Sequence, residues 1–127
     1  MARMSVSTEG APKPVARYSQ GLKVGDTLYV QGVIALDPAT GQLVPGGIEE
    51  QSRRVFDSLG AILKAAGMTM AHVVKVTAFL SDLIDYRAFN RVYGERFSAD
   101  PPPVRTTVQA KMPFGALLEV EVIACEG

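Results

Sequence analysis

The stretch LLEVEVIAC, residues 117–125, alternates apolar and acidic side chains over much of its length. Successive side chains of a β-strand point to opposite faces of its sheet. The even-numbered positions are all apolar and form one face, whereas Glu119 and Glu121 lie on the other. The stretch therefore predicts a strand with one side in a core and carboxylates on the other side.

A second strand, which carries a permanent cation, is predicted just upstream. The stretch PPVRTTVQ, residues 102–109, is rich in the β-branched residues that strands favour. Alternation places Arg105, Thr107 and Gln109 on one side of it. A guanidinium can grip a planar carboxylate through two parallel hydrogen bonds. We interpret Arg105, with Glu119 beside it on a partly covered sheet face, as the best indication of function.

Strand and helix periodicities alternate through the rest of the chain. Apolar residues at three- and four-residue spacing predict two helices. The second helix has an aromatic stripe from Tyr86 to Phe97, and Ser81 or Asp82 can cap its N-terminus. Residues 22–25 read as a turn. The predicted elements are strands at 15–20 and 27–33, a helix at 48–66, a strand at 73–80, the helix with the aromatic stripe, and the two strands quoted above.

This order predicts an α+β fold in which two helices pack on one face of a single sheet, within one domain that spans residues 1–127. The uncovered face would be too apolar for a monomer. We therefore expect a homo-oligomer with the charged pair in clefts between subunits. The residues expected on that face, beside Arg105 and Glu119, are Tyr29, Val33, Val73, Phe79, Leu117 and Ile123.

Composition excludes several classes of function. The 127 residues contain 13 basic and 13 acidic side chains, so no electrostatic footprint for nucleic acid or an anionic membrane is present. No apolar run approaches the ~20 residues of a membrane span. The single cysteine fits a reducing, cytoplasmic setting, and one histidine with one cysteine argues against a zinc site.

Several motifs in their order and spacing resemble the Rid (YjgF-like) family of imine deaminases, and the resemblance covers nearly the whole chain. It rests on YSQG at 18–21, DPATG at 37–41, KVTAFLSD at 75–82, NRVY at 90–93, PVR at 103–105 and EVEVIA at 119–124.

The resemblance implies a chorismate-mutase-like fold and a homotrimer with three sites at subunit interfaces. It also implies hydrolysis of reactive 2-imino or enamino acids, such as 2-iminobutanoate and 2-iminopropanoate, to 2-oxo acids and ammonia without a cofactor. Removal of these reactive metabolites protects other enzymes.

Site residues follow from the same resemblance. Arg105 matches the arginine that holds the substrate carboxylate, and Glu119 matches the acidic residue that positions the hydrolytic water. Tyr18 and Asn90 match a tyrosine and an asparagine of the pocket.

Two positions depart from the family pattern. The chain has Gln31-Gly32-Val33 where many deaminases have Ser-Gly-Gln, and it has Thr107 where they often have cysteine. These changes fall in the pocket and bear on substrate preference. We expect Gln31, Gly32 and Thr107 to contact the substrate.

Other interpretations stay open at this point. Arg105 and Glu119 could form a structural cross-strand ion pair. Tyr18 could simply pack at a strand end, Asn90 could satisfy a neighbouring backbone group, and Thr107 could be present only because it favours a strand. Apolar neighbours would raise the pKa of Glu119, whereas a nearby Arg105 would lower it. The alternative functions are a non-catalytic binder of small carboxylates, a deaminase for another enamine such as aminoacrylate or 2-aminomuconate, and, least supported, a ribonuclease.

Overall fold

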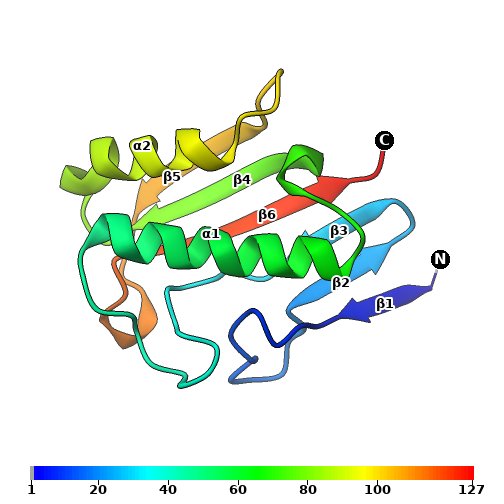
Figure 1. The fold of residues 1–127 in the computed structure, drawn as a ribbon, viewed down its shortest axis with the longest axis horizontal. Helices are drawn as coiled ribbons and strands as arrows, with labels where there is room; N and C mark the ends of the chain where they lie inside the picture. Colours follow the sequence, from blue (N-terminus) through cyan, green and yellow to red (C-terminus); the bar gives the residue numbers. More distant parts are fainter. Residues whose placement is uncertain (1) are drawn as a thin grey trace.

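Two helices pack against one face of a six-stranded sheet in the computed structural model, which describes residues 2–127 (Figure 1). The strand order is β1-β2-β3-β6-β4-β5, and only the β4–β5 pair is parallel. The predicted α+β class is therefore confirmed. The elements are β1 Arg3–Val6, β2 Gly21–Val24, β3 Thr27–Val30, α1 Ile48–Ala65, β4 Val73–Leu80, α2 Tyr86–Arg96, β5 Val104–Gln109 and β6 Leu118–Cys125, with short 3₁₀ helices η1 Met70–His72, η2 Leu83–Asp85 and η3 Pro113–Gly115.

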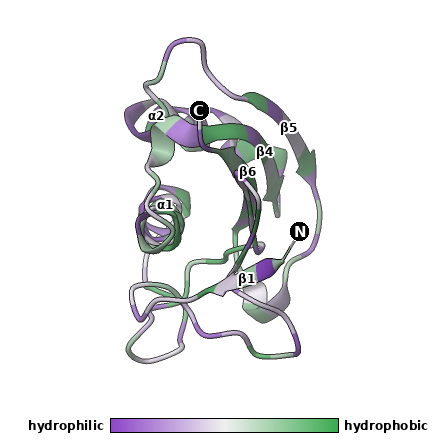
Figure 2. Cartoon of the chain, turned by 90° about the vertical axis from the view of Figure 1, so that its right-hand side faces the viewer, coloured by the Kyte–Doolittle hydropathy of each residue, from purple (hydrophilic) through white to green (hydrophobic). Residues whose placement is uncertain are grey.

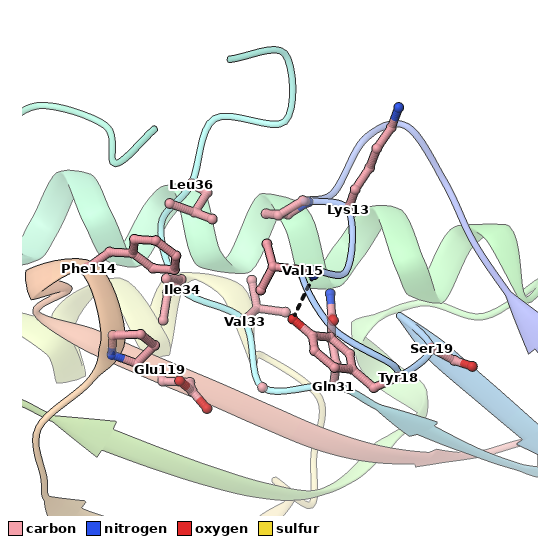
Figure 3. A pocket seen from close by; sticks show the side chains of 13 residues that line it. Lys13, Val15, Tyr18, Ser19, Gln31, Val33, Ile34, Leu36, Phe114 and Glu119 are labelled. Carbon is pink, nitrogen blue, oxygen red and sulfur yellow. Dashed lines mark hydrogen bonds between the residues drawn. The ribbon is translucent and has the colours of Figure 1, made fainter. Parts of the chain in front are cut away.

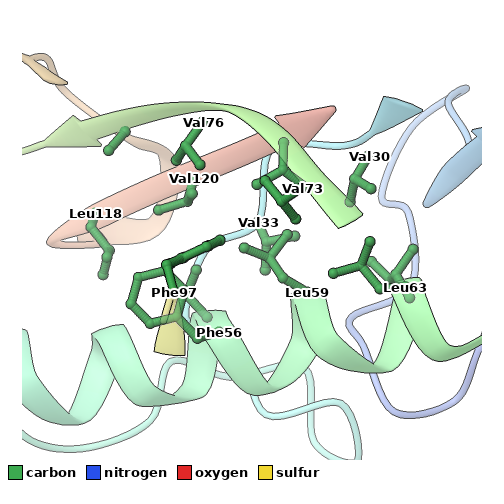
Figure 4. Close-up of a cluster of buried hydrophobic side chains, with 14 of the residues drawn as sticks. Val30, Val33, Phe56, Leu59, Leu63, Val73, Val76, Phe97, Leu118 and Val120 are labelled. Carbon is green, nitrogen blue, oxygen red and sulfur yellow. The ribbon is translucent and has the colours of Figure 1, made fainter. Parts of the chain in front are cut away.

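Helix α1 supplies the centre of the core. Its apolar stripe, which includes Phe56, Leu59 and Leu63, is buried against the sheet residues Val76 and Val120 (Figure 4). Burying one such side chain contributes about 1.5–3 kcal/mol. Because the stripe recurs at helical spacing, the predicted helix at 48–66 agrees with the structure to within one residue.

The N-terminal quarter differs from the prediction. Residues 15–20 form a loop rather than a strand, and the buried Gln20 side chain ties this loop to backbone groups of Thr8, Ala11 and Pro12. Residues 22–25, predicted as a turn, belong mostly to β2. The short, exposed strand β1 was not predicted.

Two irregularities reverse the expected faces of the sheet. Tyr29 pairs with Ile123 and Val33 with Val120, so three residues of one chain segment face two of the other. Such an extra residue is a β-bulge, and it turns Val33 into the core.

A register shift between Val73 and Lys75 similarly turns Val73 inward. The prediction that Val33 and Val73 lie on the uncovered face is therefore wrong. It is also wrong for Leu117, which precedes β6 and packs against the core.

The face opposite the helices remains apolar in part. Figure 2 shows both helices on one side of the curved sheet, with β1 and β5 at its two edges. Tyr29, Val104 and Val108 are exposed there, and Phe79 and Ile123 are half-buried. Within residues 2–127, neither helix is long and apolar enough to cross a membrane.

Candidate functional site

A cavity of about 410 Å³ opens beside the bulge that follows β3. Four of the predicted site residues line it together, namely Tyr18, Gln31, Gly32 and Glu119 (Figure 3). They come from the loop before β2, from the bulge and from β6. We call this the Glu119 cavity.

The bulge sets the position of the carboxylate. Val33 and Val120 exchange backbone hydrogen bonds of 2.9 and 3.0 Å, which fixes the bulge against β6. Gly32 then lies so close to Glu119 that a Cβ added at this glycine would overlap the carboxylate. On the other side of the cavity, the Tyr18 hydroxyl accepts a hydrogen bond of 3.3 Å from the Val15 amide.

The environment of Glu119 makes it more basic than an ordinary glutamate. Burial raises the pKa of its carboxyl, and the neighbouring charge of Glu121 raises that pKa further. Arg105 is not among the groups that influence it. A carboxylate of this kind can take a proton from water at a pH closer to neutrality.

Arg105 lies under helix α2, among aromatic side chains. Its guanidinium carbon is 4.5 Å from the centre of the Tyr93 ring, 5.5 Å from that of Phe89 and 5.6 Å from that of Tyr86. Its Nη2 donates a hydrogen bond of 3.0 Å to the Tyr86 hydroxyl. These four residues form the Arg105 cluster, in which cation–π contacts hold the guanidinium in place.

No carboxylate neutralises this guanidinium within residues 2–127, because none of the ion pairs formed there includes Arg105. The interpretation of Arg105 and Glu119 as a structural ion pair is therefore wrong. Most N–H donors of the guanidinium are left for another partner.

Two further predicted residues belong to the elements that carry this cluster. Asn90 is on α2 and Thr107 is on β5, two positions from Arg105. The Asn90 Oδ1 and the Thr107 Oγ1 are both buried without a hydrogen-bond partner. Buried polar atoms are nearly always satisfied in native proteins, by water where no protein group bonds to them, and no group of residues 2–127 bonds to these two oxygens.

The sheet separates the two groups of predicted residues. Arg105 pairs with Val76 of β4, which faces the helices, whereas Glu119 pairs with Phe79, which faces the other way. The prediction that Arg105 and Glu119 share a face of adjoining strands is wrong for a single chain. It failed because β4 lies between β5 and β6, and its register places Arg105 in the same row as Val122 of the inward face rather than in the row of Glu119.

The structure also brings in residues that the sequence reasoning did not single out as site residues. Phe114 and Lys13 line the Glu119 cavity, and Tyr86, expected only as part of a core stripe, is exposed and bonds to Arg105. The Pro-Phe-Gly sequence at 113–115 was an available signal, because proline and glycine around an aromatic residue indicate a shaped turn.

Fold and site together define a small α+β protein that carries a carboxylate-lined cavity on one side of its sheet and an arginine cluster on the other. Comparisons with known proteins identify its family. Residues 8–126 match the family model described as endoribonuclease L-PSP.

A RutC family protein of Sulfurisphaera tokodaii is 47% identical over 97% of this chain and 98% of the relative. The 2-iminobutanoate/2-iminopropanoate deaminase of Capra hircus is 40% identical over 100% of this chain and 93% of the relative. Among solved structures, E. coli TdcF with bound serine superposes with a TM-score of 0.92 at 32% identity, covering 98% of this chain and 99% of that chain. The protein belongs to the Rid (YjgF-like) family.

Proposed function

We propose that this protein is a cofactor-independent hydrolase that converts reactive 2-imino or enamino acids, such as 2-iminobutanoate and 2-iminopropanoate, to 2-oxo acids and ammonia. The observation that carries the proposal is the free guanidinium of Arg105, held by three rings but by no carboxylate of residues 2–127. A guanidinium in this state suits a planar carboxylate ligand.

Two copies of the chain would complete the site. Within one chain the sheet stands between Arg105 and Glu119, so one small molecule cannot contact both. Packing the uncovered sheet faces of several copies around an axis would bury Tyr29, Val104 and Val108. Because β5 is an edge strand, the Arg105 cluster at that edge of one copy could then face the Glu119 cavity of the next, and we propose a homotrimer with three such sites.

The chemistry needs only a positioned water and a base. Arg105 of one copy binds the substrate carboxylate, and Glu119 of the next copy holds the water. Glu119 accepts a proton from the water as the water oxygen bonds to the carbon of the imine, whose nitrogen is protonated. It returns that proton to the nitrogen of the tetrahedral carbinolamine. The C–N bond then breaks and ammonia leaves. Glu119, ionised again, takes the proton of the hydroxyl, which becomes the carbonyl of the 2-oxo acid, and passes that proton to the ammonia to give ammonium.

The relatives support a small-molecule substrate more than RNA. The goat relative is named for its action on the two imino acids above, and TdcF was crystallised with serine, a small carboxylate. The word endoribonuclease in the family model finds no support in the site, because the only histidine, His72, does not line the Glu119 cavity and the net charge is zero. We expect action inside the cytoplasm, whose reducing conditions suit a chain with a single cysteine.

A direct test follows the loss of an imine generated in situ. An amino-acid oxidase acting on L-alanine or L-2-aminobutanoate supplies the imine, and its rate of disappearance is measured with and without the protein. We expect acceleration by the native chain, none by Arg105→Ala or Glu119→Gln, and native behaviour from Arg91→Ala, which removes only an exposed ion pair with Glu49.

Two results would contradict the proposal. Retained turnover in Arg105→Ala would remove the proposed anchor. Binding of 2-oxobutanoate without any acceleration of imine loss would instead show a binder of small carboxylates.

A further inference from the structure

Phe114 has an unusual backbone and an unusual position. Its φ is 62°, and no other residue in the described part of the chain except glycine has a positive φ. The left-handed region disfavours side chains larger than hydrogen, and bulky ones most of all. Gly115, which follows it, also has a positive φ, of 70°, but glycine adopts this conformation without strain.

Packing within the chain does not explain this strain. The Phe114 side chain is 62% exposed and belongs to neither cluster of buried apolar residues. It lines the Glu119 cavity. Strained residues persist where the surrounding structure holds them for a function, and the cavity is the feature that this side chain contacts.

The cavity has an apolar end and a polar end. Figure 3 shows Phe114, Ile34 and Leu36 grouped on the side where Glu119 lies, whereas Tyr18 and Gln31 lie on the opposite side. The apolar group is therefore next to the carboxylate that would hold the water. A substrate whose reactive carbon is at Glu119 would have its side chain within reach of this group.

Size supports the same assignment. The cavity volume of about 410 Å³ lies within the range of about 300–1,000 Å³ that is typical of small-molecule pockets. A methyl or ethyl side chain would leave much of the apolar end in contact with water. A branched aliphatic or aromatic side chain would remove that apolar surface from water, which is favourable.

We propose that Phe114 determines specificity and that the Glu119 cavity selects 2-imino acids with a branched aliphatic or aromatic side chain over 2-iminopropanoate. This inference rests on the proposed function, because it assigns the substrate class of the same site. The expected selectivity in kcat/KM for the leucine-derived over the alanine-derived imine is roughly ten-fold or more.

The experiment compares imines generated in situ from L-leucine, L-phenylalanine and L-alanine, each corrected for its spontaneous hydrolysis. Phe114→Ala should lower kcat/KM for the two large imines roughly ten-fold while changing the alanine-derived value little. Phe114→Leu should keep most of the selectivity. Ile84→Ala is the matched control, because Ile84 is an equally apolar residue that is 84% exposed on η2 and does not line the cavity.

A binding measurement separates this inference from the proposed function. Calorimetry with pyruvate and 4-methyl-2-oxopentanoate, the products from the alanine and leucine imines, needs no turnover. Tighter binding of the larger 2-oxo acid, lost in Phe114→Ala, would support the inference even if no imine is hydrolysed.

Three results would overturn it. The first is equal kcat/KM and equal affinity for small and large compounds in the native protein. The second is a selectivity that Phe114→Ala does not change. The third is a change of oligomeric state in Phe114→Ala, measured by light scattering, together with an equal loss of activity on all three imines. Phe114 would then be an interface residue.

Discussion

Arg105 and Glu119 lie on opposite faces of one sheet, although the strands that carry them both pair with β4. Arg105 is opposite Val76 and contacts the rings of α2, whereas Glu119 is opposite Phe79 and lines the cavity on the other face. A cation and a base that serve one substrate must therefore come from different copies of the chain. This consequence can be tested by mixing variants.

Inactive variants should complement one another. Arg105→Ala and Glu119→Gln subunits each lack one half of every site, so each pure variant should be inactive. In mixed oligomers, a site is intact when Arg105 comes from one variant and Glu119 from the other. Random mixing at equal amounts should restore about a quarter of the wild-type rate, because each site draws its two halves from neighbouring subunits of a closed ring.

The mixture is prepared by unfolding and refolding the two variants together, and imine loss is measured as before. Refolding each variant alone is the control. An inactive mixture, with mass spectrometry showing that mixed oligomers have formed, would show that both groups of a site come from the same chain.

Gly32 should control the position of the Glu119 carboxylate. Gly32→Ala introduces a Cβ into the space that this carboxylate occupies, and the end of a flexible side chain can move without disturbing the fold. A displacement of about 1 Å in a catalytic group can lower the rate by about 100-fold. We expect a loss of kcat/KM of that order with little change in the thermal midpoint of unfolding.

Gly60→Ala is the matched control for this substitution. Gly60 lies within α1 and has open space where its Cβ would be. Alanine should therefore raise the free energy of unfolding by about 0.5–1 kcal/mol and leave activity unchanged. A Gly32→Ala variant with native kcat/KM would mean that the Glu119 carboxylate does not need its present position.

The sequence predicts the fold well where periodicity is continuous. The strand at 73–80 and the helix α1 are correct because each has a complete apolar face that must be buried. Prediction failed near the N-terminus, where residues 22–25 were read as a turn although residues 22–24 belong, with Gly21, to β2. This glycine lies in β2 because α1 packs closely there, and an added Cβ would be 3.1 Å from an Ile62 methyl carbon.

The site could be predicted only as separate residues. Local alternation says which face of its own strand a residue occupies, but strand order and bulges decide which residues meet. The bulge at Gln31–Gly32 brings Gly32 to Glu119, and the insertion of β4 separates Glu119 from Arg105. Both are properties of long-range pairing, and a single sequence carries little signal for them.

The acid limb of the pH–rate profile should report Glu119. This carboxylate acts as a base only when ionised, so kcat/KM should fall as the pH drops through its pKa, which burial first and Glu121 second raise above the ordinary value. Glu121→Gln removes the repulsion from that neighbour and should lower the pKa of Glu119. The acid limb should then move to lower pH, as measured by kcat/KM corrected for spontaneous hydrolysis at each pH.

Stability gives an independent check of the same raised pKa. The folded protein holds the proton of Glu119 more tightly than the unfolded chain, so this group stabilises the fold at acid pH and loses that effect as the pH rises through the folded-state pKa. Glu119→Gln should accordingly be more stable than the native protein at neutral pH, with a difference that shrinks on acidification. An unmoved acid limb in Glu121→Gln, together with no such pH-dependent difference, would contradict the assignment of Glu119 as the base.

Tyr86 should act by positioning Arg105. Tyr86→Phe removes the hydroxyl that accepts from Arg105 Nη2 and keeps the ring beneath the guanidinium. Loss of one partly exposed hydrogen bond of about 1 kcal/mol should raise KM about five-fold, with a smaller change in kcat. Arg91→Ala, which removes an exposed ion pair outside the Arg105 cluster, is the control. Equal losses of kcat and kcat/KM in Tyr86→Phe would instead place the hydroxyl in the chemical step.

The strained backbone of Phe114 should lower the free energy of unfolding of the protein. At a φ of 62° a phenylalanine is strained by about 1–2 kcal/mol, whereas glycine adopts this conformation freely. Because the side chain is 62% exposed, its removal sacrifices little burial. The free energy of unfolding of Phe114→Gly in urea should therefore equal the native value or exceed it by up to about 1 kcal/mol. The gain is limited by the greater freedom of glycine in the unfolded chain.

Phe114→Ala, which keeps most of the strain and loses the ring, is the comparison that isolates the backbone effect. If Phe114→Gly unfolds at lower urea concentration than Phe114→Ala, the left-handed conformation at this position is not a source of strain.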